Sequence, residues 1–130
     1  MKVSSIFIWI LRILAAVIML QTLYFKFTAH PQSVHLFTEL GMEPWGRIGT
    51  GIVELIAAIL SLYPRTTGIG ATIGVGLMGG AIFFHLTKLG IKFDGDYVLF
   101  IYALITFICC IILAWIYRSQ VFRLMKLDVA

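Results

Sequence analysis

Charged residues are scarce in this 130-residue chain: they make up 12% of it, whereas hydrophobic residues make up 61%. A typical soluble domain is about 25% charged and about 45–50% apolar. A chain with so little polar surface cannot cover itself in water, but it need not do so where lipid is the solvent. The composition therefore excludes an ordinary water-soluble domain and favours an integral membrane protein.

Common catalytic and ligand-binding motifs are also absent from the sequence. It contains no P-loop, no G-x-S-x-G, no H-E-x-x-H and no C-x-x-C pattern, and the closely spaced glycines that begin at Gly70 lie inside an apolar span, where they are packing residues and not a phosphate cradle. The two cysteines, Cys109 and Cys110, are adjacent within an apolar run. Neighbouring residues on a helix point about 100° apart, so a bond between them would be strained. The net charge of +4 comes without a basic patch interleaved with aromatic residues, so no nucleic-acid partner is expected.

Four apolar segments each approach the roughly 20 residues that cross a bilayer core as a helix. They cover residues 4–27, 45–62, 67–86 and 97–117. Short connections favour antiparallel neighbours. In the longest connection, Pro31 suits a first helical turn and Gly41 a stop, which predicts a helix over residues 31–40. The sequence thus predicts an all-α integral membrane four-helix up-down bundle, with residues 1–130 as a single transmembrane domain and a short interfacial helix in the first loop.

The basic residues suggest an orientation, because Lys and Arg are more frequent in cytoplasmic loops. Both termini are predicted on one side, which carries five such residues against four on the other, and we expect it to face the cytoplasm. The first side holds Lys2, Arg65, Arg118, Arg123 and Lys126, and the second holds Lys26, Arg47, Lys88 and Lys92.

Polar side chains inside the spans need partners or a purpose, because a charge costs roughly 2.5–3.5 kcal/mol at the centre of a membrane helix on insertion scales. At 1.5 Å per residue, Arg12 and Glu54 lie about 12 Å and about 15 Å from the same surface, which predicts a direct or water-bridged ion pair. Such a pair can equally serve only to align helices. The same reasoning gathers Lys26, Arg47 and His85 near the opposite surface, beneath the short helix. The predicted ligand-binding polar core is Arg12, Lys26, Arg47, Glu54 and His85.

Two kinds of ligand suit this core. One is an amphipathic molecule such as a quinone, since bundle interiors host such sites. Stacking surface would come from Tyr24, Trp45, Phe83, Phe84 and Tyr102. The other is a metal ion held by His35 and Glu39, four residues apart on one helix face, with His30 or His85 as a third ligand. Because no metal-binding motif is present, no metal is expected.

Glycine is concentrated in the third segment. Gly70 and Gly74, and again Gly76 and Gly80, are spaced four residues apart. Small residues at this spacing let another helix backbone approach closely. They predict close packing inside the bundle, or a contact with a partner protein or a second copy.

Short motifs in a fixed order give the chain a family resemblance. They are residues 26–31 (KFTAHP), residues 37–44 (FTELGMEP), Glu54 in an apolar span, and residues 79–85 (GGAIFFH). Together they resemble the DoxX-like family of small four-helix bacterial membrane proteins. The resemblance implies four transmembrane helices in the bacterial cytoplasmic (inner) membrane. The residues that match those recurring in the family are Arg12, Lys26, Glu54 and His85.

Some members of this family belong to thiosulfate:quinone oxidoreductase, others associate with redox or detoxifying partners, and many have no assigned activity. No cysteine here matches the one expected for sulfur transfer, because Cys109 and Cys110 lie in the middle of a span. The leading hypothesis is therefore an accessory subunit of a redox-linked assembly that binds a quinone or lipid-like molecule, and not an enzyme on its own. The alternatives are a structural or assembly subunit without ligand chemistry, and a quinone-linked oxidoreductase subunit. In each case the expected partners are lipid, other membrane or redox proteins, or further copies of the chain.

Overall fold

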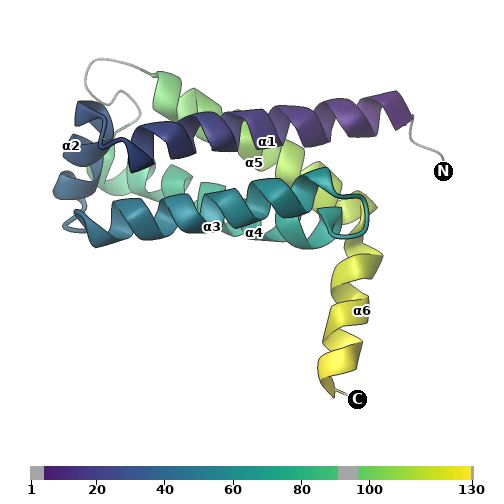
Figure 1. The fold of residues 1–130 in the computed structure, drawn as a ribbon. Helices are drawn as coiled ribbons and strands as arrows, with labels where there is room; N and C mark the ends of the chain where they lie inside the picture. Colours follow the sequence, from purple (N-terminus) through teal and green to yellow (C-terminus); the bar gives the residue numbers. More distant parts are fainter. Residues whose placement is uncertain (1–4, 91–96, 130) are drawn as a thin grey trace.

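The computed structural model describes residues 5–90 and 97–129, with side chains as far as residue 123 (Figure 1). Within these residues the chain forms six α-helices and one π-helical turn, and contains no β-strand. The prediction of an all-α protein is therefore confirmed.

Four helices in the described part of the chain are long and apolar enough to cross a membrane. They run antiparallel, and each packs against the next in the cyclic order α1, α3, α4, α5 (Figure 1). The start of α1 and the end of α5 lie at the same end of the bundle. The predicted up-down membrane bundle is thus confirmed. Its helices are α1 (Ser5–Phe27), α3 (Trp45–Leu62), α4 (Thr67–Phe84) with the π-helix η1 (His85–Leu89), and α5 (Val98–Ile116).

The short helix α2 (Pro31–Glu39) covers the end of the bundle opposite the termini (Figure 1). Pro31 occupies its first turn, and the ring of His30 accepts a hydrogen bond from the backbone N–H of Gln32. The helix stops at Gly41, whose φ of 73° is unfavourable for other residues. The N–H groups of Gly41 and Met42 bond back to the carbonyls of Thr38 and Phe37, which forms a Schellman motif.

A sixth helix, α6 (Arg118–Val129), follows α5 and points away from the bundle axis (Figure 1). This helix was not among the predicted elements, because the stretch is too polar to resemble a span. Gln120 fixes the direction in which α6 leaves the bundle. Its side-chain oxygen accepts from the Gly68 N–H at 2.7 Å, and its amide nitrogen donates to the Pro64 carbonyl at 2.8 Å.

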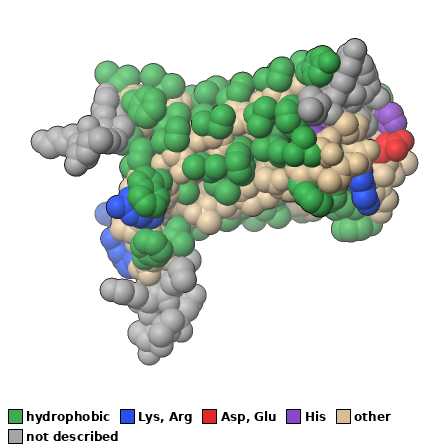
Figure 2. Space-filling model, turned by 180° about the vertical axis from the view of Figure 1, so that it is seen from behind, with side chains coloured by type: hydrophobic (Ala, Val, Ile, Leu, Met, Phe, Trp, Pro, Cys, Tyr) green, Lys and Arg blue, Asp and Glu red, His purple; other side chains and the backbone are tan. Residues whose placement is uncertain are grey.

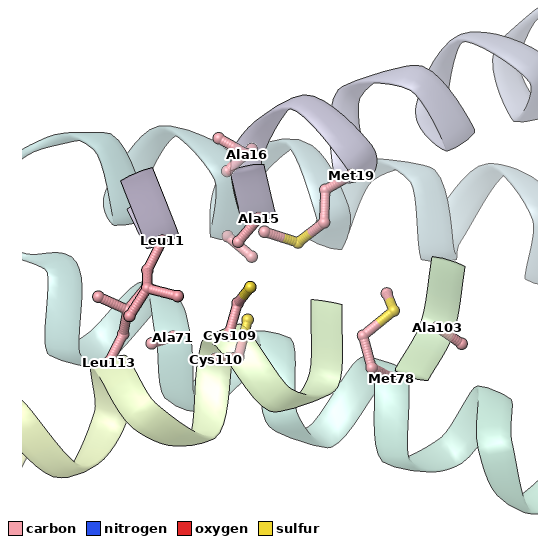
Figure 3. Packing of buried hydrophobic residues seen from close by; sticks show 12 residues of the cluster. Leu11, Ala15, Ala16, Met19, Ala71, Met78, Ala103, Cys109, Cys110 and Leu113 are labelled. Atoms are coloured by element: carbon pink, nitrogen blue, oxygen red, sulfur yellow. The ribbon is translucent and has the colours of Figure 1, made fainter. Parts of the chain in front are cut away.

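The core is built mostly from small side chains, so the helix backbones approach closely. Met19, Cys110 and Met78 fill its centre, and Figure 3 shows Met19 and Cys110 pointing into the same space between α1 and α5. Hydrophobic side chains cover the sides of the bundle, whereas charged side chains gather at its two ends (Figure 2). This is the surface expected of a helix bundle surrounded by lipid.

Candidate functional site

A cavity of about 300 Å³ lies inside the bundle at the end that α2 covers. Every helix of the bundle and α2 contribute to its wall. Most of the lining is apolar, and the polar exceptions are few. They are Thr22, Lys26, Ser33, Thr50, Glu54, His85 and Tyr102.

Lys26 and Glu54 form a buried ion pair in the cavity wall. Lys26 Nζ lies 2.9 Å from Glu54 Oε1, and the two side chains are 14% and 1% exposed. The Thr22 hydroxyl donates to Glu54 Oε2 at 3.0 Å. Thr22 precedes Lys26 by one helical turn, so α1 presents both groups to the carboxylate from one face. The pair therefore places a positive and a negative charge side by side in an apolar enclosure.

His85 begins the π-helical turn η1 and is 3% exposed. Its Nδ1 donates to the Gly90 carbonyl at 3.0 Å, and its ring packs edge-on against Phe100. Because a carbonyl can only accept, Nδ1 carries a proton in this contact, and Nε2 is the ring nitrogen left for another partner. The turn η1 extends the third span to Leu89, three residues beyond the predicted end.

The predicted ion pair between Arg12 and Glu54 is wrong. Arg12, 2% exposed, instead donates to the carbonyls of Ser61, at 3.1 Å, and Leu62, and its guanidinium lies over the Trp9 ring. The prediction assumed that α1 and α3 reach the same surface together. In fact the start of α1 extends beyond the end of α3 (Figure 1). The hydrogen bonds of Arg12 to the last carbonyls of α3 place it level with that end. Glu54 consequently lies opposite Thr22 and Lys26.

At the opposite end of the α1–α3 pair, Arg47 contacts the end of α1 as Arg12 contacts the end of α3. It donates to the carbonyl of Lys26, near the end of α1, and forms a two-pronged ion pair with Glu43. Cations at helix C-termini satisfy the last carbonyls and oppose the helix dipole. Arg12 and Arg47 thus each cap the other helix of the pair, outside the cavity wall. Of the five residues of the predicted polar core, the structure brings Lys26, Glu54 and His85 into the cavity wall.

The two glycine pairs of α4 occupy different surroundings. A methyl group added at Gly70 would lie 2.6 Å from the backbone nitrogen of Ser61, and one added at Gly74 would lie 2.5 Å from Cys110 Sγ. This pair therefore lets α4 pack closely against α3 and α5. A methyl group added at Gly76 or Gly80 would meet no neighbouring group within 4 Å among the described residues, and both glycines line the cavity.

Only some of the aromatic side chains that were predicted to stack on a ligand line the cavity. Phe84 and Tyr102 line the cavity. Tyr24, Trp45 and Phe83 are more than half exposed on the outer surface, where they cannot contact a ligand in the cavity. Phe25 and Phe37 line it instead. Phe37 lies on the buried side of α2, but the sequence could not show that Phe25 points inward.

The structure does not bring the residues of the alternative metal site together. His35 Nε2 lies 3.3 Å from Glu39 Oε1 on the exposed side of α2, whereas His85 is buried in the cavity wall. Across residues 5–90 and 97–129, no three His, Cys, Asp or Glu side chains gather closely enough to hold a metal ion.

The fold and the cavity together define a class: a small multi-pass membrane protein with a charged pair buried at one end of a four-helix bundle. The family model of the DoxX-like family matches residues 10–112, and the chain belongs to this family. None of the curated proteins and none of the solved structures compared with the chain matches it.

Proposed function

We propose that this chain is an accessory subunit of a redox-linked assembly in the bacterial cytoplasmic membrane, and that its cavity binds a quinone or a similar lipid-like molecule. One observation carries the proposal: the Lys26–Glu54 pair and His85 line the same apolar cavity. Ionisable groups within membrane spans are costly and generally mark functional sites. Arg12 and Arg47 cap helices outside the cavity wall, whereas Lys26, Glu54 and His85 line the cavity, where a ligand can contact them.

The polar groups suit a small ring that carries oxygen atoms. The Lys26 ammonium has three N–H donors, so it can pair with Glu54 and still donate to a ligand carbonyl. His85 Nε2 can accept a hydrogen bond from a ligand hydroxyl. Phe25, Phe84 and Tyr102 provide apolar and aromatic surface for the ring. A quinone offers carbonyls when oxidised and hydroxyls when reduced, so this set of groups serves both forms.

The arrangement of the charges supports a cytoplasmic location for both termini. At the α2 end, Lys26 and Arg47 are each paired with a carboxylate within the bundle, and Lys88 is exposed. At the other end, Arg65, Arg118 and Arg123 are exposed. Lys2, Lys92 and the side chain of Lys126 lie outside the described residues. The exposed basic residues therefore favour the terminal side as the cytoplasmic one.

Native mass spectrometry of the protein, extracted gently from bacterial membranes, tests the proposal. We expect a retained mass of quinone size in the wild type, lost in Glu54→Gln. Glu43→Gln is the matched control, because Glu43 also pairs with a basic side chain but lies outside the cavity wall. It should keep the ligand. Circular dichroism of each variant checks that the helices remain folded.

Two results would contradict the proposal. One is a wild-type protein that carries no small molecule but a stoichiometric protein partner, which would favour the structural or assembly role. The other is a ligand retained equally by both variants, which would place it outside the cavity. A ligand lost only because Glu54→Gln unfolds would be revealed by circular dichroism, and Lys26→Arg, which keeps the charge, would then replace it as the test variant.

A further inference from the structure

The wall of the cavity is incomplete between α3 and α4. The two helices touch at Gly70, where an added methyl group would collide with the backbone of Ser61 and Ala57. Farther along α4, at Gly76 and Gly80, no group of α3 lies within reach of such a methyl group. Of the described residues of α3, Thr50 and Glu54 line the cavity, and Thr50 is only half-buried. Leu77 and Phe84, on the same face of α4 as Gly70, also line the cavity, so at the α2 end the cavity lies between the two helices.

The lining of the cavity follows the surface of α4 outward through this gap. Leu77 and Phe84 follow Gly70 at seven-residue intervals, so they share its face toward α3. Gly80 and then Gly76 lie farther round the helix, away from the bundle centre. All four residues line the cavity, yet Gly76 is exposed on the outside of the bundle. The cavity thus continues from the Lys26–Glu54 pair to the outer surface.

The depth of the gap shows what it opens into. Helix α4 and η1 form one span of 23 residues, Thr67–Leu89. Its midpoint is Met78, so Gly76 and Gly80 lie within about 3 Å of that midpoint along the helix axis. This level of a span faces the hydrocarbon core of the bilayer. A part of a ligand that leaves the cavity here enters lipid tails and must be apolar.

The size of the cavity also indicates that part of a long-tailed ligand would lie outside it. About 300 Å³ is at the lower limit of the usual range for ligand cavities. It has room for a ring-sized head group but not for a long-tailed lipid as a whole. The glycines leave a smooth backbone surface at Gly76 and Gly80, with no side chains to fill the gap.

From these observations we infer that the ligand is an amphiphile with a single long hydrocarbon tail, and that this tail passes between α3 and α4 into the bilayer across Gly76 and Gly80. This inference rests on the proposed function, because it assumes a head group at Lys26, Glu54 and His85. It makes the ligand a lipid-dissolved molecule that enters sideways from the membrane, and it excludes a water-soluble metabolite.

Photocrosslinking in bilayer nanodiscs of phosphatidylethanolamine and phosphatidylglycerol tests the inference. The probe is a benzoquinone with an alkyl tail that carries a diazirine. We expect labelled peptides to concentrate at Thr50 and around Gly76 to Gly80, and an excess of tailless benzoquinone to suppress them. Gly76→Leu and Gly80→Leu should reduce this labelling on the order of tenfold, because the added side chains fill the gap. Gly49→Leu is the matched control: Gly49 is an exposed glycine of α3 with open space that does not line the cavity.

The other outcomes separate the two proposals. Labelling elsewhere on the bundle, with head-group binding still dependent on Glu54, would overturn the tail path and leave the proposed function intact. Binding that does not depend on Glu54 would overturn both. A phosphatidylcholine with a diazirine in its acyl chain should label the gap weakly. If it labels the gap as strongly as the quinone probe does, and equally in Glu54→Gln, the gap holds an ordinary membrane lipid and the inference is wrong.

Discussion

Removing the positive partner of the buried pair should destabilise the bundle more than removing the negative one. In Lys26→Met, the Glu54 carboxylate stays 1% exposed, with the Thr22 hydroxyl as its remaining partner. A stranded buried charge of this kind costs about 3–5 kcal/mol of unfolding free energy. In Glu54→Gln, the amide can keep the hydrogen bond to Thr22. Lys26, near the end of α1, can extend its flexible stem toward the membrane surface. We expect a cost of about 1–3 kcal/mol, that of a lost charged hydrogen bond.

The double variant Lys26→Met/Glu54→Met tests whether the two costs share one cause. Replacing a whole buried ion pair by hydrophobic residues of similar volume is often neutral or stabilising, by about 1–4 kcal/mol. The double variant should therefore be at least as stable as wild type, although each single change destabilises.

The assay is reversible denaturation of the ligand-free protein in mixed micelles, followed by far-ultraviolet circular dichroism. All four proteins are compared under the same conditions, and the double-mutant cycle gives the coupling between the two sites. Strictly additive costs, or equal costs for both single changes, would refute the reasoning that the pair is coupled and that Lys26 can reach the surface alone.

Two further predictions concern the tightly packed end of the bundle. Gly74→Ala should cost about 1–3 kcal/mol, because the added methyl group lies 2.5 Å from Cys110 Sγ. Adding Cys110→Ala removes that sulfur and should recover most of the loss in the same denaturation assay; no recovery would locate the conflict elsewhere. Arg12→Met should cost about 1–3 kcal/mol, because it removes the side-chain donor to the Leu62 carbonyl and one of the two donors to the Ser61 carbonyl, which keeps only the Thr67 hydroxyl. Arg12→Lys should recover only part of this loss, since an ammonium cannot reproduce the guanidinium fork, and an Arg12→Met protein as stable as wild type would contradict the capping role.

The spans could be predicted because their signals are local. A run of apolar residues long enough to cross a bilayer identifies each of the four helices without reference to the others. Pro31 and Gly41 likewise mark the ends of α2, since each acts through its own backbone. Helix α6 carries no such local signal. The direction in which it leaves the bundle depends on hydrogen bonds between Gln120 and residues more than fifty positions away in the sequence.

The partners of the buried charges could not be predicted in the same way, because they depend on how far one helix slides past another. The predicted depths assumed that α1 begins and α3 ends at one plane. Helix α1 has 23 residues and α3 has 18, and the surplus extends beyond the end of α3. That offset moves Arg12 away from Glu54 and brings Lys26 to it. The sequence did identify Lys26, Glu54 and His85 as the groups that need an explanation, since each is polar within an apolar span.

The bundle is tightly packed at the end near the termini and forms the cavity at the α2 end. Toward the termini, Gly70 brings α3 and α4 into contact, Arg12 caps α3, and Thr67 donates to the carbonyls of Ser61 and Tyr63. Toward α2 the cavity lies between the same helices and takes the place of packed side chains. Local opening requires least free energy where buried contacts are fewest. The α2 end is therefore the part of the bundle that can admit a ligand while the other end stays closed. Substitutions at Arg12 or Gly74 should accordingly lower stability without altering which molecule binds, whereas substitutions at Gly76 or Gly80 should alter binding at little cost in stability.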